Sequence, residues 1–148
     1  MTRTSLKEAD TWFLEAKRLL ARGEHDRALQ LLQRSAEAVP GRARVEHDTA
    51  ELARRLGKLD LAVTHYRRAS AAYAHTGAWR HAVIPLRIAL HVEQSRLPAS
   101  AAIFARISRE LAEALVAQGF GADARHTIQS SARAFAERGM PVPDELRC

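Results

Sequence analysis

The sequence has few of the residues that hold small secreted or all-β domains together. Its 148 residues include one cysteine, Cys148, so neither an internal disulfide nor a thiol metal cage can form. We expect an incidental exposed thiol there, with intermolecular pairing or lipidation less favoured. Aromatic residues make up 5%, with 7 glycines and 5 prolines, which favours helices over a sandwich or barrel. A chain of this length buries roughly 70% of its unfolded surface and needs no metal to fold.

Long apolar runs are also missing. No segment approaches the roughly 18 consecutive apolar residues that a bilayer-spanning helix needs. The first ten residues carry charges with no apolar stretch behind them, which does not fit a secretory signal. The sequence therefore predicts a cytoplasmic protein without membrane attachment.

The sequence has none of the common constellations of catalytic residues. The only Gly-x-Gly, Gly119-Phe120-Gly121, follows no strand, so a nucleotide-binding loop is unsupported. The sequence has neither a His-Glu-x-x-His motif nor a nucleophile elbow. No two of the seven histidines lie four residues apart, the spacing that two metal ligands on one helix face need. We predict surface or turn histidines, no metal, no cofactor and no enzymatic activity.

What the sequence does contain is internal repetition. Four glycines are each followed five residues later by alanine, and each pair lies between two stretches of helical apolar spacing: Gly23/Ala28, Gly57/Ala62, Gly77/Ala82 and Gly119/Ala124. Glycine after a helix adopts the left-handed conformation that ends it at little cost. A small residue just after the turn lets two antiparallel backbones approach. The pattern predicts helical hairpins.

The first two units repeat at a spacing of 34 residues, from Gly23 to Gly57 and from Leu32 to Tyr66. At this period the sequence resembles the tetratricopeptide repeat (TPR) family, with one helix-turn-helix in each repeat. The first unit carries the resemblance best, at positions Trp12, Ala16, Leu19, Gly23, Ala28, Leu32, Ser35 and Pro40. The second unit fits less well, because Glu46, Thr49 and Ala53 stand where large residues are usual. The regular period ends near residue 75.

The resemblance implies an all-α fold, a TPR-like right-handed superhelix of about seven antiparallel-paired helices. We predict helices over residues 7–22, 25–39, 43–56, 59–75, 78–94, 99–118 and 122–138. They would form a single domain over residues 1–140, followed by a flexible tail over 141–148. We expect the aromatic stripe of Trp12, Tyr66, Tyr73 and Phe135 to be core. Trp79 is the aromatic residue that could instead anchor a partner.

The charge is uneven. The net charge is +6, and residues 52–109 contain ten Lys or Arg against two acids, Asp60 and Glu93. Such a region favours anionic partners. Arginine outnumbers lysine twenty to three, so a bias in genomic base composition is an equally good explanation.

In the TPR family, the first helix of each pair lines a groove that receives a peptide or a partner helix. The resemblance places here Phe13, Lys17, Arg44, His47, Glu51, Arg54, Arg106 and Arg109, together with Asp10 and Glu113. A groove rich in arginine suits an acidic peptide, because guanidinium pairs with carboxylate through two hydrogen bonds. The sequence has no asparagine, so the carboxylate clamp of some family members is not reproduced.

These features predict a non-enzymatic interaction module, an adaptor or scaffold that binds an acidic peptide or partner protein. Two alternatives remain open. The basic region 52–109 could bind nucleic acid or another anionic ligand, with a steep dependence on salt. The chain could instead form a structural homo-oligomer through its last helix, where Phe135 and Ala136 have little charge beside them. Solvated helix faces with no partner are as good an explanation of the groove charges.

Overall fold

The computed structural model describes residues 3–147, with side chains from Leu6 onward, so the prediction for Cys148 lies outside the described residues. This part of the chain consists of helices joined by short turns, and no strand occurs within residues 3–147. They are α1 (Arg3–Ala21), α2 (His25–Ala38), α3 (Ala43–Arg55), α4 (Leu59–His75), α5 (Trp79–Gln94), α6 (Ala101–Ala117), α7 (Gly121–Glu137) and the 3-10 turn η1 (Asp144–Leu146). The predicted ends agree within two residues, except that α1 begins four residues earlier.

The glycines that follow α1, α4 and α6 end those helices in the same way. Gly23 has a φ of 77°, and the amide of the next residue, Glu24, donates to the Leu19 carbonyl at 2.9 Å. Gly119 has a φ of 89°, and Phe120 donates to Leu115 at 2.8 Å. This bond satisfies a carbonyl that the helix end leaves free. The turn is short, so the following helix runs back beside the one before it.

Replacing Gly119 by alanine is expected to lower the free energy of unfolding by about 1 kcal/mol, because a Cβ is strained at positive φ. Nothing lies within 4 Å of that Cβ, so the loss comes from the backbone alone. Gly121 is the matched control, since it is helical and its Cβ would meet only Arg125 Nη1 at 3.8 Å. Urea unfolding should show no loss for Gly121→Ala. Equal losses for both variants would contradict this account of the turn.

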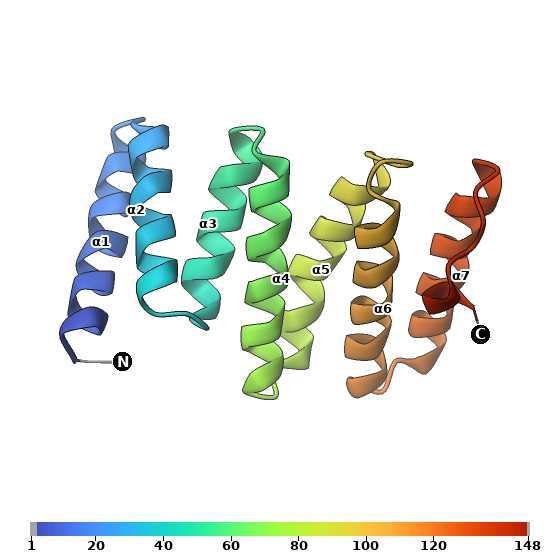
Figure 1. The fold of residues 1–148 in the computed structure, drawn as a ribbon. Helices are drawn as coiled ribbons and strands as arrows, with labels where there is room; N and C mark the ends of the chain where they lie inside the picture. Colours follow the sequence, from blue (N-terminus) through green and yellow to red (C-terminus); the bar gives the residue numbers. More distant parts are fainter. Residues whose placement is uncertain (1–2, 148) are drawn as a thin grey trace. The chain divides into compact units, whose positions relative to one another are not determined.

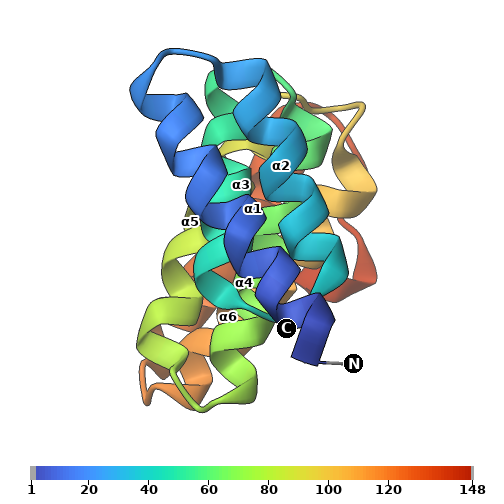
Figure 2. The same ribbon diagram turned by 90° about the vertical axis from the view of Figure 1, so that its left-hand side faces the viewer.

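The chain divides into two compact units, residues 1–72 and 73–148, where the sequence predicts a single domain. The division falls near residue 75, where the regular repeat ends. In the first unit, α1 and α2 form a hairpin, and α3 follows against α2 (Figures 1 and 2). Small residues allow this close packing, and Ala16, Ala28 and Ala62 are fully buried.

The second unit contains α5, α6 and α7, with α6 in contact with both neighbours. Phe104 of α6 and Phe135 of α7 are each 1% exposed, and their ring centroids lie 5.8 Å apart. Pro85 lies inside α5, and its side chain is buried. The alternative in which Phe135 of the last helix forms an oligomer contact gains no support, because this ring is packed against α6.

The segment after α7 also differs from the prediction of a flexible tail. Residues 144–146 form η1, which contacts α6 and α7. Leu146 is 2% exposed, because its apolar side chain lies on these two helices. This leucine accounts for the packing of a segment whose prolines suggest a loose end.

The predicted aromatic core is confirmed in part. Tyr66 and Phe135 are buried, whereas Trp12 and Tyr73 are half-buried. Arg34 lies over the Trp12 ring, 4.5 Å from its centroid. Trp79, which we considered as a partner anchor, is half-buried at the start of α5.

Candidate functional site

Helices α1 and α3 carry seven of the ten predicted groove residues, all within the first unit. One of them, Asp10, pairs with Arg42 at 2.5 Å. We call the surface of Phe13, Lys17, Arg44, His47, Asp48, Glu51 and Arg54 the α1–α3 face. At its centre is Asp48, which pairs with Lys17 Nζ at 2.6 Å and with Arg44 Nε at 3.3 Å. The Lys17 ammonium also lies 5.1 Å from the centroid of the Phe13 ring, within the range of a cation–π contact.

Asp48 is the residue that the sequence analysis missed on this face. Its one carboxylate serves two cations, so the cluster of Lys17, Asp48 and Arg44 has an excess of one positive charge. The Arg44 side chain is 76% exposed, against 16% for Asp48. Arg44 is therefore the most accessible cation of the cluster, and Lys17 of the same cluster lies over the half-buried Phe13 ring.

The other half of the face forms a network around Tyr66 of α4. The Tyr66 hydroxyl donates to Glu51 Oε1 at 2.5 Å and accepts from Arg54 Nε at 2.9 Å. Arg54 Nη2 also donates to Glu51 Oε2 at 2.9 Å. His47 completes the group, with its ring edge-on to Tyr66 at 5.8 Å and its Nε2 3.9 Å from Glu51. Arg54 and Glu51 thus join α3 to α4, and their polar groups are engaged within the protein.

The network shifts three pKa values. Burial raises the pKa of Tyr66 to about 12, and the hydrogen bond to Glu51 adds to the effect. Burial would also raise the pKa of Glu51, but hydrogen bonds from Tyr66 and Arg54 outweigh it, and the pKa falls below 4.5. The hydrogen bond to Tyr66, followed by that to Glu51, raises the pKa of Arg54. The neutral phenol and the charged carboxylate are therefore the stable forms at neutral pH.

Tyr66 is expected to titrate near pH 12. The chain has two tyrosines, so absorbance at alkaline pH in the Tyr73→Phe variant reports Tyr66 alone. Because the folded pKa lies above the ordinary value of 10, Tyr66 stabilises the fold below pH 10, and this contribution is lost between pH 10 and 12. Glu51→Gln should lower the midpoint, since it removes a negative charge beside the phenolate. A midpoint near 10 that Glu51→Gln leaves unchanged would contradict the network.

Arg106, Arg109 and Glu113, the other three predicted groove residues, lie in the second unit on α6. All three are exposed, and Arg109 Nε is 3.6 Å from Glu113 Oε1, an exposed pair of little energetic weight. The structure does not place them relative to the α1–α3 face. Arg109 instead borders a groove between α6 and α7, described below.

The prediction of surface or turn histidines is wrong for His65. Its side chain is 4% exposed, and its Nδ1 lies 2.5 Å from Oε2 of Glu46, itself 2% exposed. Glu46 occupies a position where the TPR resemblance expects a large apolar residue. Both residues lie on the apolar stripes of neighbouring helices, which is the signal that could have revealed the pair. Burial without a partner would be costly for either group, so the pairing explains why both side chains can be buried.

Several cations of the basic region 52–109 have partners inside the protein. Arg54 is bound to Glu51 and Tyr66, and Arg96 donates to buried Glu93 at 2.9 Å. Arg67 also interacts with another group. No three His, Asp, Glu or Cys side chains come together as a metal site within residues 6–147. None of the helices in that part of the chain is both long enough and apolar enough to cross a bilayer.

The buried positions of the first two hairpins keep the 34-residue spacing. Ala28 and Ala62 are both fully buried, as are Leu32 and Tyr66. The left-handed turns at Gly23 and Gly57 keep the same spacing. The chain has a TPR-like helical fold.

Similarity to known proteins is found in structure and not in sequence. No protein family and no curated protein matches the sequence. The solved structures similar to it include MamA (12% identity, 88% of this chain and 75% of that one, TM-score 0.40). A Podosopora anserina kinesin light chain with nearly identical TPR-like repeats shares 17% identity over 88% and 76% of the chains, at 0.40. BtubC from P. vanneervenii shares 14% over 92% and 66%, at 0.45. At these scores no residue of theirs can be transferred to this TPR-like chain.

Proposed function

We propose that this TPR-like chain is a non-enzymatic, cytoplasmic interaction module that binds an acidic segment of a partner protein on the α1–α3 face. The observation that carries the proposal is the cluster of Phe13, Lys17, Asp48 and Arg44. It combines an excess positive charge with a half-buried aromatic ring on two adjacent helices. Such a face can bind a carboxylate and an apolar side chain together.

Arg44 has the central role in this proposal. Its Nε donates to Asp48 Oδ2 at 3.3 Å while 76% of its side chain is exposed, so the guanidinium is accessible to a partner carboxylate. Lys17 is the second cation, and Phe13 beside it accepts an apolar side chain. Arg54, His47 and Glu51 form the border of the site and hold α3 against α4.

The two cations and the aromatic ring define the bound segment. We expect a short segment with an acidic residue that pairs with Arg44 or Lys17 and an apolar residue that contacts Phe13.

The test is a selection of peptides from a displayed random library with the intact chain as bait. The selected peptides are expected to be rich in aspartate and glutamate, and Arg44→Glu should weaken their binding at least tenfold in fluorescence anisotropy. Arg27→Glu is the matched control, because Arg27 is 70% exposed and makes one exposed ion pair, with Glu24. It should leave affinity within twofold. Equal losses for both variants would mean that only the net charge matters.

The two alternative functions give different outcomes in the same assay. A single-stranded oligonucleotide that binds with a steep salt dependence, and as well to Arg44→Glu, would favour the nucleic-acid alternative. Light scattering that gives a dimer mass, with no peptide selected, would favour a structural homo-oligomer. Either result would contradict the α1–α3 face as the main binding site.

A further inference from the structure

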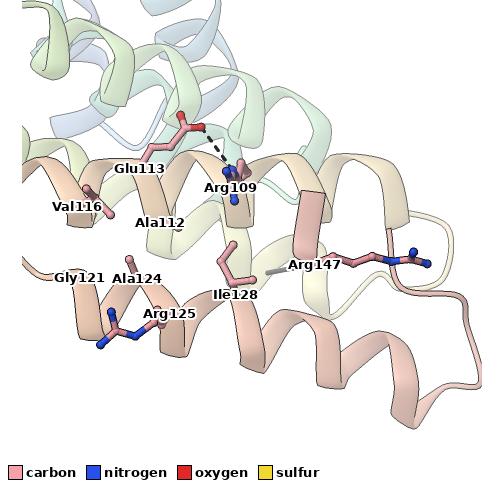
Figure 3. A pocket seen from close by; sticks show the side chains of 9 residues that line it. All are labelled: Arg109, Ala112, Glu113, Val116, Gly121, Ala124, Arg125, Ile128 and Arg147. Atoms are coloured by element: carbon pink, nitrogen blue, oxygen red, sulfur yellow. Dashed lines mark ion pairs between the residues drawn. The ribbon is translucent and has the colours of Figure 1, made fainter. Parts of the chain in front are cut away.

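The second unit contains an open groove between α6 and α7, which we call the α6–α7 groove. It has a volume of about 470 Å³ and is lined by Arg109, Ala112, Glu113, Val116, Gly121, Ala124, Arg125, Ile128 and Arg147. In Figure 3, Ala112 and Val116 of α6 lie opposite Ala124 and Ile128 of α7, and Arg109, Arg125 and Arg147 lie around them. The groove thus has an apolar floor and a basic border.

The groove lies where the first hairpin carries a third helix. The turn glycines Gly23 and Gly119 are 96 positions apart, and at this offset Lys17 corresponds to Glu113. In the first hairpin, Lys17 forms its ion pair with Asp48 of α3. Eight of the nine residues that line the groove have a counterpart 96 positions earlier in the α1–α2 hairpin. These counterparts are Phe13, Ala16, Lys17, Leu20, His25, Ala28, Leu29 and Leu32. These are the residues of the α1–α2 hairpin on the side of Lys17, which faces α3.

Exposure shows that the rim of the corresponding surface of the second hairpin is uncovered, while Ala112, Ala124 and Ile128 at its floor are buried like their counterparts. Val116 is 61% exposed, whereas its counterpart Leu20 is half-buried. Leu29 is 1% exposed, whereas its counterpart is the exposed Arg125. After α7 the described chain continues as η1, which buries Leu146 but leaves the groove beside Arg147 open. Phe120, in the turn between α6 and α7, is a further exposed apolar residue, at 49%.

We propose that the α6–α7 groove receives an acidic amphipathic helix of a partner protein, in the place that α3 takes on the first hairpin. The charges decide the chemistry of this helix. Three arginines and one glutamate, Glu113, line the groove, a net charge of +2. Arg109 and Arg147 already pair at 3.6 Å with Glu113 and Asp144, so Arg125 is the main cation directed to a partner. Carboxylates on both sides of an apolar stripe match this border.

The length of the groove fits a short helix. Arg109 and Val116 are seven residues apart, or about 10 Å along α6, which is two helical turns. Leucine or a similar side chain at i, i+3, i+4 and i+7 would contact the exposed Val116 and the alanine floor. This site lies in the second unit and is separate from the α1–α3 face, so either can fail without the other.

The experiment uses the full chain and a fluorescent, capped peptide of about 14 residues, with leucine at i, i+3, i+4 and i+7 and glutamate on both flanks. We expect saturable binding in anisotropy, and circular dichroism should show that the peptide becomes helical. Arg125→Glu should weaken binding at least tenfold and Val116→Ser about threefold. Arg133→Glu, a charge reversal on the exposed side of α7, should change it less than twofold, as should Arg44→Glu on the α1–α3 face.

A peptide with lysine in place of glutamate tests the charge, and one with its leucines spread around the helix tests the apolar stripe. Both should bind at least tenfold more weakly. The proposal is overturned if either binds as well as the acidic amphipathic peptide, or if Arg125→Glu has no effect. A dimer in light scattering that Arg125→Glu dissociates would identify a second copy of this chain as the occupant and would equally overturn it.

Discussion

Replacing Glu46 by alanine is expected to lower the free energy of unfolding of the first unit by about 3–5 kcal/mol, because His65 is then left without its buried partner. The carboxylate and the imidazole are 2% and 4% exposed and lie 2.5 Å apart. Burying a polar group without a hydrogen-bond partner is costly. The measurement is denaturant unfolding followed by Trp12 fluorescence in a Trp79→Phe background, so that the signal comes from the first unit alone.

Two controls separate this pair from the removal of a side chain in general. Glu37→Ala, at an exposed position of α2, should lower the free energy of unfolding by less than about 0.5 kcal/mol. The double variant Glu46→Leu with His65→Leu should recover most of the loss, because apolar residues of similar volume replace a buried pair at little cost. A loss below about 1 kcal/mol for Glu46→Ala would show that the pair is not buried as described.

Phe135→Ala is expected to destabilise the second unit by about 3–5 kcal/mol, since it removes a ring that is 1% exposed and packed on Phe104. The cavity would lie between α6 and α7. Trp79 fluorescence in a Trp12→Phe background reports this unit.

Phe120→Ala is the control, because this ring is 49% exposed, and it should cost less than about 1 kcal/mol. If Phe135 instead lay on an open, dimerising end of the array, Phe135→Ala would leave the unfolding free energy unchanged and reduce the molecular mass in light scattering. That pair of results would contradict the packing of α7.

The helices could be predicted from sequence because their ends depend on local chemistry. A glycine at positive φ and a buried alanine five residues later are constraints within one turn, and they identify the hairpins at Gly23, Gly57 and Gly119. The break in spacing after residue 75 also lies near the boundary between the two units. Local sequence features were therefore sufficient to predict most of the secondary structure.

Contacts between helices were harder to predict. Glu46 and His65 are 19 residues apart, and the residues next to each in sequence do not indicate that the two side chains pair. Asp48 neutralises one of the two positive charges of Lys17 and Arg44, so the α1–α3 face is less basic than the predicted residues indicated. Leu146 packs onto α6 and α7 although the prolines before it suggest a loose tail. Each of these depends on which helix faces meet, and a linear pattern does not specify that.

The most direct test of the proposed function is the location of a bound acidic peptide by backbone amide NMR. On titration with a peptide selected by this chain, we expect the largest saturable shifts at Phe13, Lys17, Arg44 and Asp48, and their loss in Arg44→Glu. Shifts confined to the α6–α7 groove, or spread over all exposed arginines without saturation, would contradict the α1–α3 face as the binding site.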